Sequence, residues 1–264
     1  MIVVKIGGRV VKNSLDKVLL DIPNIKDKII LVHGGGDIVT EYSKKMGIEP
    51  TFVTSPNGIR SRYTTKEELD IYVMAMSLIN KQIVGKLCSI GVNAIGISGV
   101  DGNILTAERK KRIVIIDERG KKRIIDGGYT GKVKEIRSKI LFDLINIFDV
   151  IVFSPIALDP VEKTPLNIDG DQAAFSISKS IKPDTLIFLS DVDGVLIDGK
   201  VINKLTKNEA KVLSNKIGAG MNRKLLMAAE SLEYGVNKVI ISNGLKENPI
   251  TNALAFNGTV IING

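Results

Sequence analysis

Lys5 is the first residue of this chain whose type and position could support chemistry. It lies near the end of a short apolar run and is followed, after one isoleucine, by Gly7 and Gly8. An ammonium group beside residues that lack a Cβ lies close to bare backbone N–H groups, so an anionic group can approach closely. This arrangement suits a phosphoryl group. Taken alone, the stretch also fits a strand-end lysine that reaches solvent before an ordinary glycine turn.

A second glycine-rich turn and one aspartate could serve the same chemistry. Gly34, Gly35 and Gly36 follow His33 at the end of an apolar run. Consecutive N–H groups beside a helix N-terminus would form a cradle for phosphate or carboxylate there, unless the turn is only a flexible connection. Asp171 lies where a polar loop opens a helix of small residues. It acts either as a cap or first-turn acid, or as a carboxylate that orients lysines.

Two basic segments are candidates for binding anions. Arg60 and Arg62 follow a turn and could clamp a carboxylate in bidentate fashion, with a solvated basic loop as the alternative. Basic clusters at residues 108–112 and 119–123 flank the apolar run 113–116, which predicts a β-hairpin with basic arms. This hairpin is either a docking surface for an acidic partner or a solvated charged arm.

The composition limits the possible functions. With 264 residues, 44% of them hydrophobic, the chain is long enough to bury a large core. One cysteine, Cys88, and one histidine, His33, cannot build a zinc site or an internal disulfide framework, so we expect a cytoplasmic protein. No apolar run suggests a membrane span. The net charge of +8 favours an acidic partner, and the aromatic content of 5% disfavours nucleic acid.

Apolar runs of strand length alternate with helical patterns along the whole chain. This alternation predicts an α/β fold with a mostly parallel sheet, covered on both sides, whose function lies at the carboxyl ends of the strands. Ser14 is expected to begin and cap the first helix, and the helix at 67–87 is apolar on more than one face, which predicts a homodimer contact. The predicted strands are 1–8, 28–32, 94–97, 150–153, 186–189, 238–241 and 259–262, and the clearest helices are 14–20, 67–87 and one that opens at 218–224 and ends near 234.

Seven short motifs follow one another along the chain. They are Lys5-x-Gly7-Gly8, His33-Gly34-Gly35-Gly36, Asn57-Gly58-x-Arg60, Ser98-Gly99-x-Asp101-Gly102, Asn167-x-Asp169-x-Asp171-Gln172-Ala173-Ala174, Ser190-Asp191-Val192-x-Gly194 and Gly220-Met221-x-x-Lys224. Together they resemble the amino acid kinase family, specifically its acetylglutamate kinase branch, over essentially the whole chain. The resemblance implies a three-layer αβα sandwich with two lobes, in which residues 1–176 bind the acceptor and residues 177–264 bind ATP.

This resemblance also implies the reaction. A phosphoryl group passes from ATP, bound with Mg²⁺, to a side-chain carboxylate, and an acyl phosphate forms. Lys5 and Lys224 match the two lysines that stabilise charge, and Asp171 matches the acid that holds them in place; no side-chain metal ligands are expected. Two ammonium groups and glycine N–H donors suffice for in-line transfer without a covalent intermediate. The matching substrate-binding residues are Gly8, Gly35, Gly36, Arg60, Arg62 and Asn167, and the matching nucleotide-binding residues are Gly7, Ser190, Asp191, Gly194, Gly220 and Met221.

One difference between this chain and the branch pattern limits the range of possible substrates. The branch has a single Arg-Val-Thr where this chain has Arg60-Ser61-Arg62-Tyr63-Thr64, so both arginines remain candidates for substrate binding. This run, the start of the chain directly in a strand and the basic hairpin look like the sub-branch that acts on aminoadipate or glutamate attached to a small acidic amino-group carrier protein, in lysine and arginine biosynthesis. The sequence does not choose between these acceptors, because one methylene is worth only about 1–3 kcal/mol.

Two other functions remain open at this point. One is an ordinary acetylglutamate kinase that uses a free small substrate. The other is a non-catalytic nucleotide-binding regulator on the same fold, which would usually lack one of Lys5, Asp171 and Lys224, although all three are present. The partners expected are therefore ATP, the acidic carrier and a second copy of the chain, with no nucleic acid and no membrane.

Overall fold

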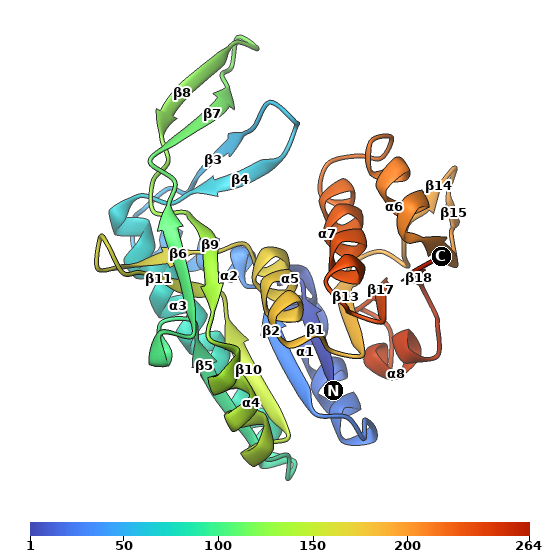
Figure 1. Ribbon diagram of the computed structural model, residues 1–264. Coiled ribbons are helices and arrows are strands. Elements are labelled where there is room, and N and C mark those ends of the chain that lie inside the picture. The colour runs from blue at the N-terminus through green and yellow to red at the C-terminus, as the bar shows by residue number, and fades with distance from the viewer.

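The protein is built on one eight-stranded sheet, and its computed structural model describes residues 1–264 (Figure 1). Neighbouring strands are parallel, except that β17 and β18 are antiparallel. The predicted mostly parallel sheet is therefore confirmed. In spatial order the strands are β16 (Lys204–Thr206), β18 (Thr259–Ile262), β17 (Lys238–Asn243), β13 (Thr185–Ser190), β1 (Ile2–Ile6), β2 (Ile29–His33), β10 (Val150–Ser154) and β5 (Ala94–Ser98).

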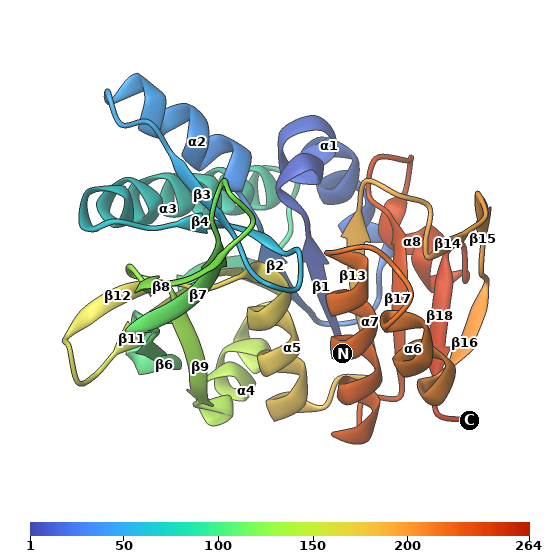
Figure 2. The ribbon, with the colours of Figure 1, turned by 90° about the horizontal axis from the view of Figure 1, so that it is seen from above.

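Helices cover both faces of this sheet, which gives the predicted three-layer αβα sandwich (Figure 2). One face carries α1 (Gly8–Asp21), α2 (Gly36–Lys45), α3 (Lys66–Ser89) and α8 (Pro249–Leu254). The other carries α4 (Ser138–Ile147), α5 (Gly170–Ile181), α6 (Lys207–Ser214) and α7 (Met221–Glu233). Short 3₁₀ turns lie at Ile22–Asn24 and Asp101–Asn103. No helix is both long enough and apolar enough to cross a bilayer.

The alternation of side chains along β1 directs Lys5 toward α5. Val3 belongs to the buried cluster on the α5 face, whereas Ile2, Val4 and Ile6 belong to the cluster on the α1 face. Side chains two residues apart in a strand lie on the same face, so Lys5 shares the face of Val3. The core pattern of one strand thus places an ammonium group beneath the N-terminus of α5.

The prediction that the first helix begins at Ser14 is wrong. Helix α1 begins at Gly8, directly after β1, and Ser14 lies inside it with a non-helical backbone of φ −148° and ψ 22°. The earlier turn forms because Val10 and Val11 are buried against the sheet, where the core stabilises a helix that local capping signals do not mark. Ser14 marks a kink, and the glycine pair marks the start.

Two smaller four-stranded sheets and one two-stranded ribbon extend the fold. The first sheet has the strand order β12 (Thr164–Asn167), β11 (Ile156–Asp159), β6 (Leu105–Arg109) and β9 (Gly131–Ile136). The second sheet has the order β4 (Arg60–Tyr63), β3 (Thr51–Thr54), β7 (Arg112–Ile116) and β8 (Lys122–Asp126). The ribbon pairs β14 (Leu196–Ile197) with β15 (Lys200–Val201). Figure 1 shows the β3–β4 and β7–β8 hairpins projecting together beyond the main sheet.

The basic hairpin differs from its prediction in its first arm. Residues 112–116 and 122–126 form the two arms, with Arg112 opposite Asp126. Arg109 instead ends β6, which pairs with β9 and β11 because Leu105 and Ala107 are buried there. The chain therefore changes sheets between Arg109 and Arg112.

The expected lobe boundary after residue 176 lies inside α5. The main sheet is continuous across the two expected lobes, because β1 pairs with β13. The division into an acceptor lobe and an ATP lobe stays a prediction.

Candidate active site

Asp171 lies between Lys5 and Lys224. Its two carboxylate oxygens are 2.6 Å from the Lys5 ammonium and 2.5 Å from the Lys224 ammonium, and all three side chains are largely buried. Burial alone would raise the pKa of Asp171, but the two ammonium groups hold that pKa far below its usual range. Burial would lower the pKa of Lys5, and Asp171 reverses this effect so that the pKa is raised. Two positive charges are thus kept together at the carboxyl edge of the sheet.

The N-cap of α5 is Asp169, so capping is not the role of Asp171. The Asp169 side chain accepts a hydrogen bond from the backbone N–H of Gln172 at 3.1 Å. Asp171 follows in the first helical turn, where the helix dipole favours a negative charge. The structure therefore excludes a capping role, and Asp171 is a first-turn acid whose carboxylate contacts both lysines.

Two glycine turns meet beside these charges. Strands β1 and β2 are parallel neighbours, so the turns that follow them lie at the same edge of the sheet. A Cβ on Gly34 would lie 2.8 Å from the Gly8 nitrogen, and one on Gly8 would lie 3.3 Å from the Gly36 nitrogen. Gly8 begins α1, Gly36 begins α2, and neither helix has a side-chain cap. Two helix N-termini therefore present free N–H donors to one place, which favours an anion.

All six expected substrate-binding residues line one cavity of about 330 Å³ beside the glycine turns. It is large enough for an amino-acid side chain with its α-substituents. Asn167 donates a hydrogen bond to the Thr64 hydroxyl at 2.9 Å. The residues that line it include Gly8, Gly35, Gly36, Arg60, Arg62 and Asn167.

The two candidate arginines are in different situations. Arg62 is only 8% exposed and pairs at 3.0 Å with Glu68, which is 1% exposed. A second nitrogen of Arg62 donates to the Gly36 carbonyl at 3.0 Å, so Arg62 holds the second glycine turn in place. Arg60 is exposed, stacks 4.4 Å from the centre of the Phe52 ring and forms no ion pair. Its guanidinium donors remain free to face a ligand.

The expected nucleotide-binding residues lie at the ends of β1 and β13 and at the start of α7. The Gly7 nitrogen donates to the Leu189 carbonyl at 3.0 Å, and Ser190 ends β13 with a buried hydroxyl that has no partner. Asp191 pairs with Arg9. Burial would raise the pKa of Asp191, but the hydrogen bond and charge of Arg9 lower it.

The other three nucleotide candidates are spread more widely. Gly220 precedes α7 with a φ of 93°, a conformation that favours glycine, and Met221 is the first residue of that helix. Gly194 packs against Thr259, where a Cβ would lie 2.7 Å from the hydroxyl. A larger cavity, about 630 Å³, lies over β17 and β18 and contains none of the expected site residues. The chain has no group of three or more His, Cys, Asp or Glu residues that could hold a metal ion.

His33 is a buried, neutral group behind the second glycine turn. Burial lowers its pKa to about 4. Its Nδ1 lies 3.1 Å from the Gly34 carbonyl and its Nε2 lies 2.8 Å from the Ser154 hydroxyl. The carbonyl can only accept, so Nδ1 donates to it and Nε2 accepts from Ser154. His33 therefore supports the glycine turn and carries no charge at neutral pH.

Arg223 is a site residue that the sequence reasoning did not assign. It lines the 330 Å³ cavity from the first turn of α7 and lies 3.6 Å from Asp169. Its position directly before Lys224 was the available signal, because a helix N-terminus that brings Lys224 to the site also brings its neighbour.

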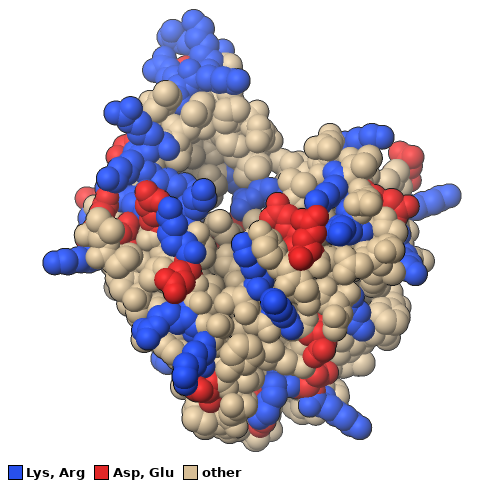
Figure 3. Space-filling model, viewed as in Figure 1, with Lys and Arg blue, Asp and Glu red and all other residues tan.

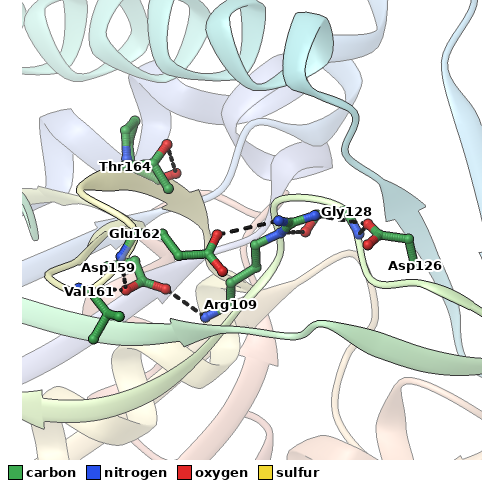
Figure 4. A network of polar contacts seen from close by, with 8 residues as sticks. Arg109, Asp126, Gly128, Asp159, Val161, Glu162 and Thr164 are labelled. Atoms are coloured by element: carbon green, nitrogen blue, oxygen red, sulfur yellow. Dashed lines mark hydrogen bonds and ion pairs between the residues drawn. The ribbon is translucent and has the colours of Figure 1, made fainter.

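Basic side chains gather on the projecting hairpins, as Figure 3 shows at the top of the molecule. Arg109 does not belong to this exposed group. Its Nε donates to the Gly128 carbonyl at 2.7 Å, and it pairs with Asp126 at 2.9 Å and Glu162 at 3.3 Å (Figure 4). Arg109 thus joins the base of the β7–β8 hairpin to the β11–β12 turn. The exposed basic residues of the hairpin and of the segment that leads into it are Lys110, Lys111, Arg112, Arg119, Lys121, Lys122 and Arg123.

Residues 1–243 match the model of the amino acid kinase family. The chain belongs to the amino acid kinase family. A protein of Saccharolobus solfataricus named [LysW]-aminoadipate/[LysW]-glutamate kinase is 75% identical over 264 residues, 100% of each chain. A protein of the same name from Sulfurisphaera tokodaii is 62% identical over 262 residues, which cover 99% of this chain and 100% of the relative.

Solved structures show the same fold at low identity. N-acetylglutamate synthase from Neisseria gonorrhoeae has a TM-score of 0.82 at 23% identity, covering 100% of this chain and 59% of that one. Carbamate kinase from Giardia has a TM-score of 0.67 at 16% identity, covering 100% and 98%. The family resemblance read from the seven motifs is confirmed, and this amino acid kinase is a phosphotransferase.

Proposed function

We propose that this amino acid kinase phosphorylates the side-chain carboxylate of L-2-aminoadipate or L-glutamate linked to a small acidic LysW-like carrier protein. ATP is the phosphoryl donor and the product is an acyl phosphate. The names of the full-length relatives support this substrate class. The observation that carries the chemistry is the Lys5–Asp171–Lys224 bridge beside two converging helix N-termini. In this role the protein would serve lysine biosynthesis and, with glutamate, arginine biosynthesis.

The proposed catalytic groups act by neutralising charge. Transfer between a carboxylate and a phosphate chain brings two anions together, and negative charge spreads over the transferred group in the transition state. Lys5 and Lys224 meet that charge from one side, and the N–H groups at Gly8 and Gly36 meet it from the other. Asp171 keeps both ammonium groups at fixed distances from each other, so no reorganisation is needed during transfer. None of these residues has to form a covalent bond.

The acceptor is proposed to lie in the 330 Å³ cavity with its side-chain carboxylate at the glycine turns. Arg60, Arg62 and Asn167 line the same cavity and would bind its other polar groups. Arg60 is the better candidate for a direct ion pair, because Glu68 already occupies Arg62.

The nucleotide is proposed to bind along the ends of β1 and β13 and the first turn of α7. The unpartnered, buried Ser190 hydroxyl fits a ligand at this place, because buried hydroxyl groups are rarely left without a hydrogen bond. Gly7, Asp191, Gly194, Gly220 and Met221 complete the proposed set. Mg²⁺ would be held by the phosphates of the nucleotide and would supply further charge neutralisation.

The carrier is proposed to dock on the β7–β8 hairpin. The exposed Lys and Arg residues there form a concentrated positive surface, which would attract an acidic protein and speed the encounter.

We further propose a homodimer through α3, because this helix exposes the apolar side chains of Met74 and Leu78 beside its buried face. We also propose a cytoplasmic location, to which the single cysteine is suited.

The test is a comparison of three acceptors in an ATP-dependent assay that traps the acyl phosphate with hydroxylamine. The expected result is turnover with carrier-linked aminoadipate, carrier-linked glutamate or both, at a kcat/KM far above that of free N-acetyl-L-glutamate. Equal or better turnover of the free compound would overturn the carrier-linked substrate in favour of an ordinary acetylglutamate kinase. Absence of turnover with all three would favour a nucleotide-binding regulator.

A further inference from the structure

A second cavity, about 370 Å³, adjoins the acceptor cavity on the side of the projecting hairpins. Four residues line both cavities: Ser61, Thr130, Asp169 and Arg223. None of the glycines of the two turns lines the second cavity. The second cavity is therefore farther than the acceptor cavity from the glycine turns, where the side-chain carboxylate of the acceptor is proposed to lie. Apolar side chains of β7, such as Ile113 and Ile115, form part of its wall.

Arg223 lies where the two cavities meet, and its guanidinium is not hydrogen-bonded within the chain. It forms an ion pair with Asp169 at 3.6 Å, a distance that is longer than a hydrogen bond. That carboxylate also accepts the bond that caps α5. A guanidinium has five N–H donors in a fixed plane, so Arg223 keeps its capacity to bind a ligand in bidentate fashion.

Lys110 lines the second cavity and forms no ion pair with any carboxylate. Loss of water around its ammonium group and the nearby positive charge of Arg223 lower its pKa. The main chain of Lys110 is fixed, because its nitrogen donates to the Thr130 carbonyl at 2.9 Å. A Cβ on Gly127 would lie 1.5 Å from the Lys110 carbonyl oxygen, so only glycine allows this close approach.

The second cavity therefore holds two cations and one carboxylate, Asp169, among its charged residues. The positive charges of Lys110 and Arg223 repel each other in this partly enclosed space, and a bound anion would reduce the repulsion. We propose that Lys110 and Arg223 form a subsite for a carboxylate carried by the acyl group on the amino nitrogen of the acceptor. This rests on the proposed function, in which the amino group of the acceptor is joined to an acidic carrier. The subsite would distinguish an acidic tether from a neutral one.

The test uses two small acceptors that differ only at the end of the acyl chain. N-succinyl-L-glutamate ends in a carboxylate, and N-butyryl-L-glutamate ends in a methyl group on a chain with the same number of carbon atoms. Dissociation constants for both are measured by calorimetry on the full chain. The wild-type protein is expected to bind the succinyl compound about tenfold more tightly, as for a charged hydrogen bond that is partly screened by solvent.

The same ratio is then measured in variants. Lys110→Met with Arg223→Gln is expected to reduce the preference to within about twofold, and Lys110→Met alone to reduce it in part. Lys111→Met is the matched control, because Lys111 is the next residue but lines a different cavity, one formed by residues of β6 and the β11–β12 turn. It should keep the preference of the wild-type protein. Thermal melting checks that each variant is folded, and the single Lys110 variant carries the test if the double variant is not.

The outcomes separate the subsite from the proposed function. Equal affinity of the wild-type protein for both compounds overturns the subsite, whatever acceptor is turned over. An equal loss of preference in the Lys111 control also overturns it, because the effect would then come from the general positive field. Efficient turnover of free N-acetyl-L-glutamate overturns the carrier-linked substrate but leaves the two dissociation constants unchanged.

Discussion

Replacing Asp171 by asparagine removes the negative charge between Lys5 and Lys224 and keeps the shape of the side chain. The pKa of Asp171 is far below its usual range, because the two ammonium groups outweigh burial, so the carboxylate is ionised at neutral pH. The substitution leaves two positive charges that face each other without a counter-charge. We expect both lysine side chains to move apart and lose their alignment.

The structure sets the size of the effect. Loss of one preorganised charged group from a transition state costs about 2.7–4 kcal/mol, or roughly 10²–10³ in kcat. Removal of one partner of a fully buried ion pair destabilises the fold by about 3–5 kcal/mol. Asp171 is 12% exposed and the lysine chains can swing into the cavity, so the stability cost should be smaller, about 1–3 kcal/mol. Asp171→Asn should therefore damage catalysis more than folding.

The assay pairs steady-state kinetics with urea denaturation of the same variant. Asp16→Asn serves as the control, because Asp16 also pairs with a lysine, Lys86, but its side chain is 71% exposed. The control should change stability by less than about 1 kcal/mol and leave kcat unchanged. A kcat for Asp171→Asn within threefold of wild type, with or without a loss of stability, would refute the role of the carboxylate in aligning the lysines.

Four further predictions address other parts of the molecule. Lys224→Ala should lower kcat by about two to three orders of magnitude in a protein that is still folded by circular dichroism, and a near-normal kcat would remove Lys224 from the mechanism. His33 has a pKa of about 4 when folded against 6.5 as its ordinary value. The unfolded chain therefore binds the proton first, and stability should fall as the pH drops through this window. Urea curves of His33→Gln should lose this part of the pH dependence, whereas parallel pH profiles would contradict it. Replacing Lys111, Lys121 and Lys122 together by serine should raise the KM for the carrier-linked substrate and reduce the salt dependence of that KM, because exposed charges are screened over about 8 Å. The KM for ATP should not change. An unchanged KM for the carrier-linked substrate at low salt would indicate that the hairpin is only a solvated arm. Light scattering at micromolar concentration should show a homodimer, and a monomer would refute the α3 contact.

Seven strands of the main sheet were predictable from the sequence because each is a short, mostly apolar run in a sheet that is buried on both faces. The eighth, β16, was not, because it is a three-residue edge strand in which only Leu205 is apolar. The Lys5, Asp171 and Lys224 motifs could also be read. Lys5 lies near the end of such a strand, Asp171 and Lys224 lie in the first turns of helices, and all three match a family pattern. The start of α1 could not be read in the same way. Burial of Val10 and Val11 in the tertiary structure stabilises its first turn, and no local capping residue signals it.

Other features depend on contacts that a local sequence pattern does not show. Glu68 lies only six residues after Arg62, but no local pattern shows that it will be buried against that arginine, so the different situations of Arg60 and Arg62 appear only in the folded chain. Arg109 looked like part of a basic hairpin, but its strand pairs with β9 and its charge is balanced by Asp126 and Glu162. Register and pairing in small sheets are set by such tertiary contacts.

The central position of β1 governs how this chain can fold. Ile2 pairs with Ile29 on one side and with Thr185 on the other, so the sheet is complete only after a loop of more than 150 residues has closed. Closure of so long a loop carries a large entropic cost and slows folding. During synthesis, the half that begins near β13 can complete its sheet only on a strand made at the very start. A fragment of residues 177–264 would leave one edge of β13 without its partner β1, so we expect this fragment not to fold by itself.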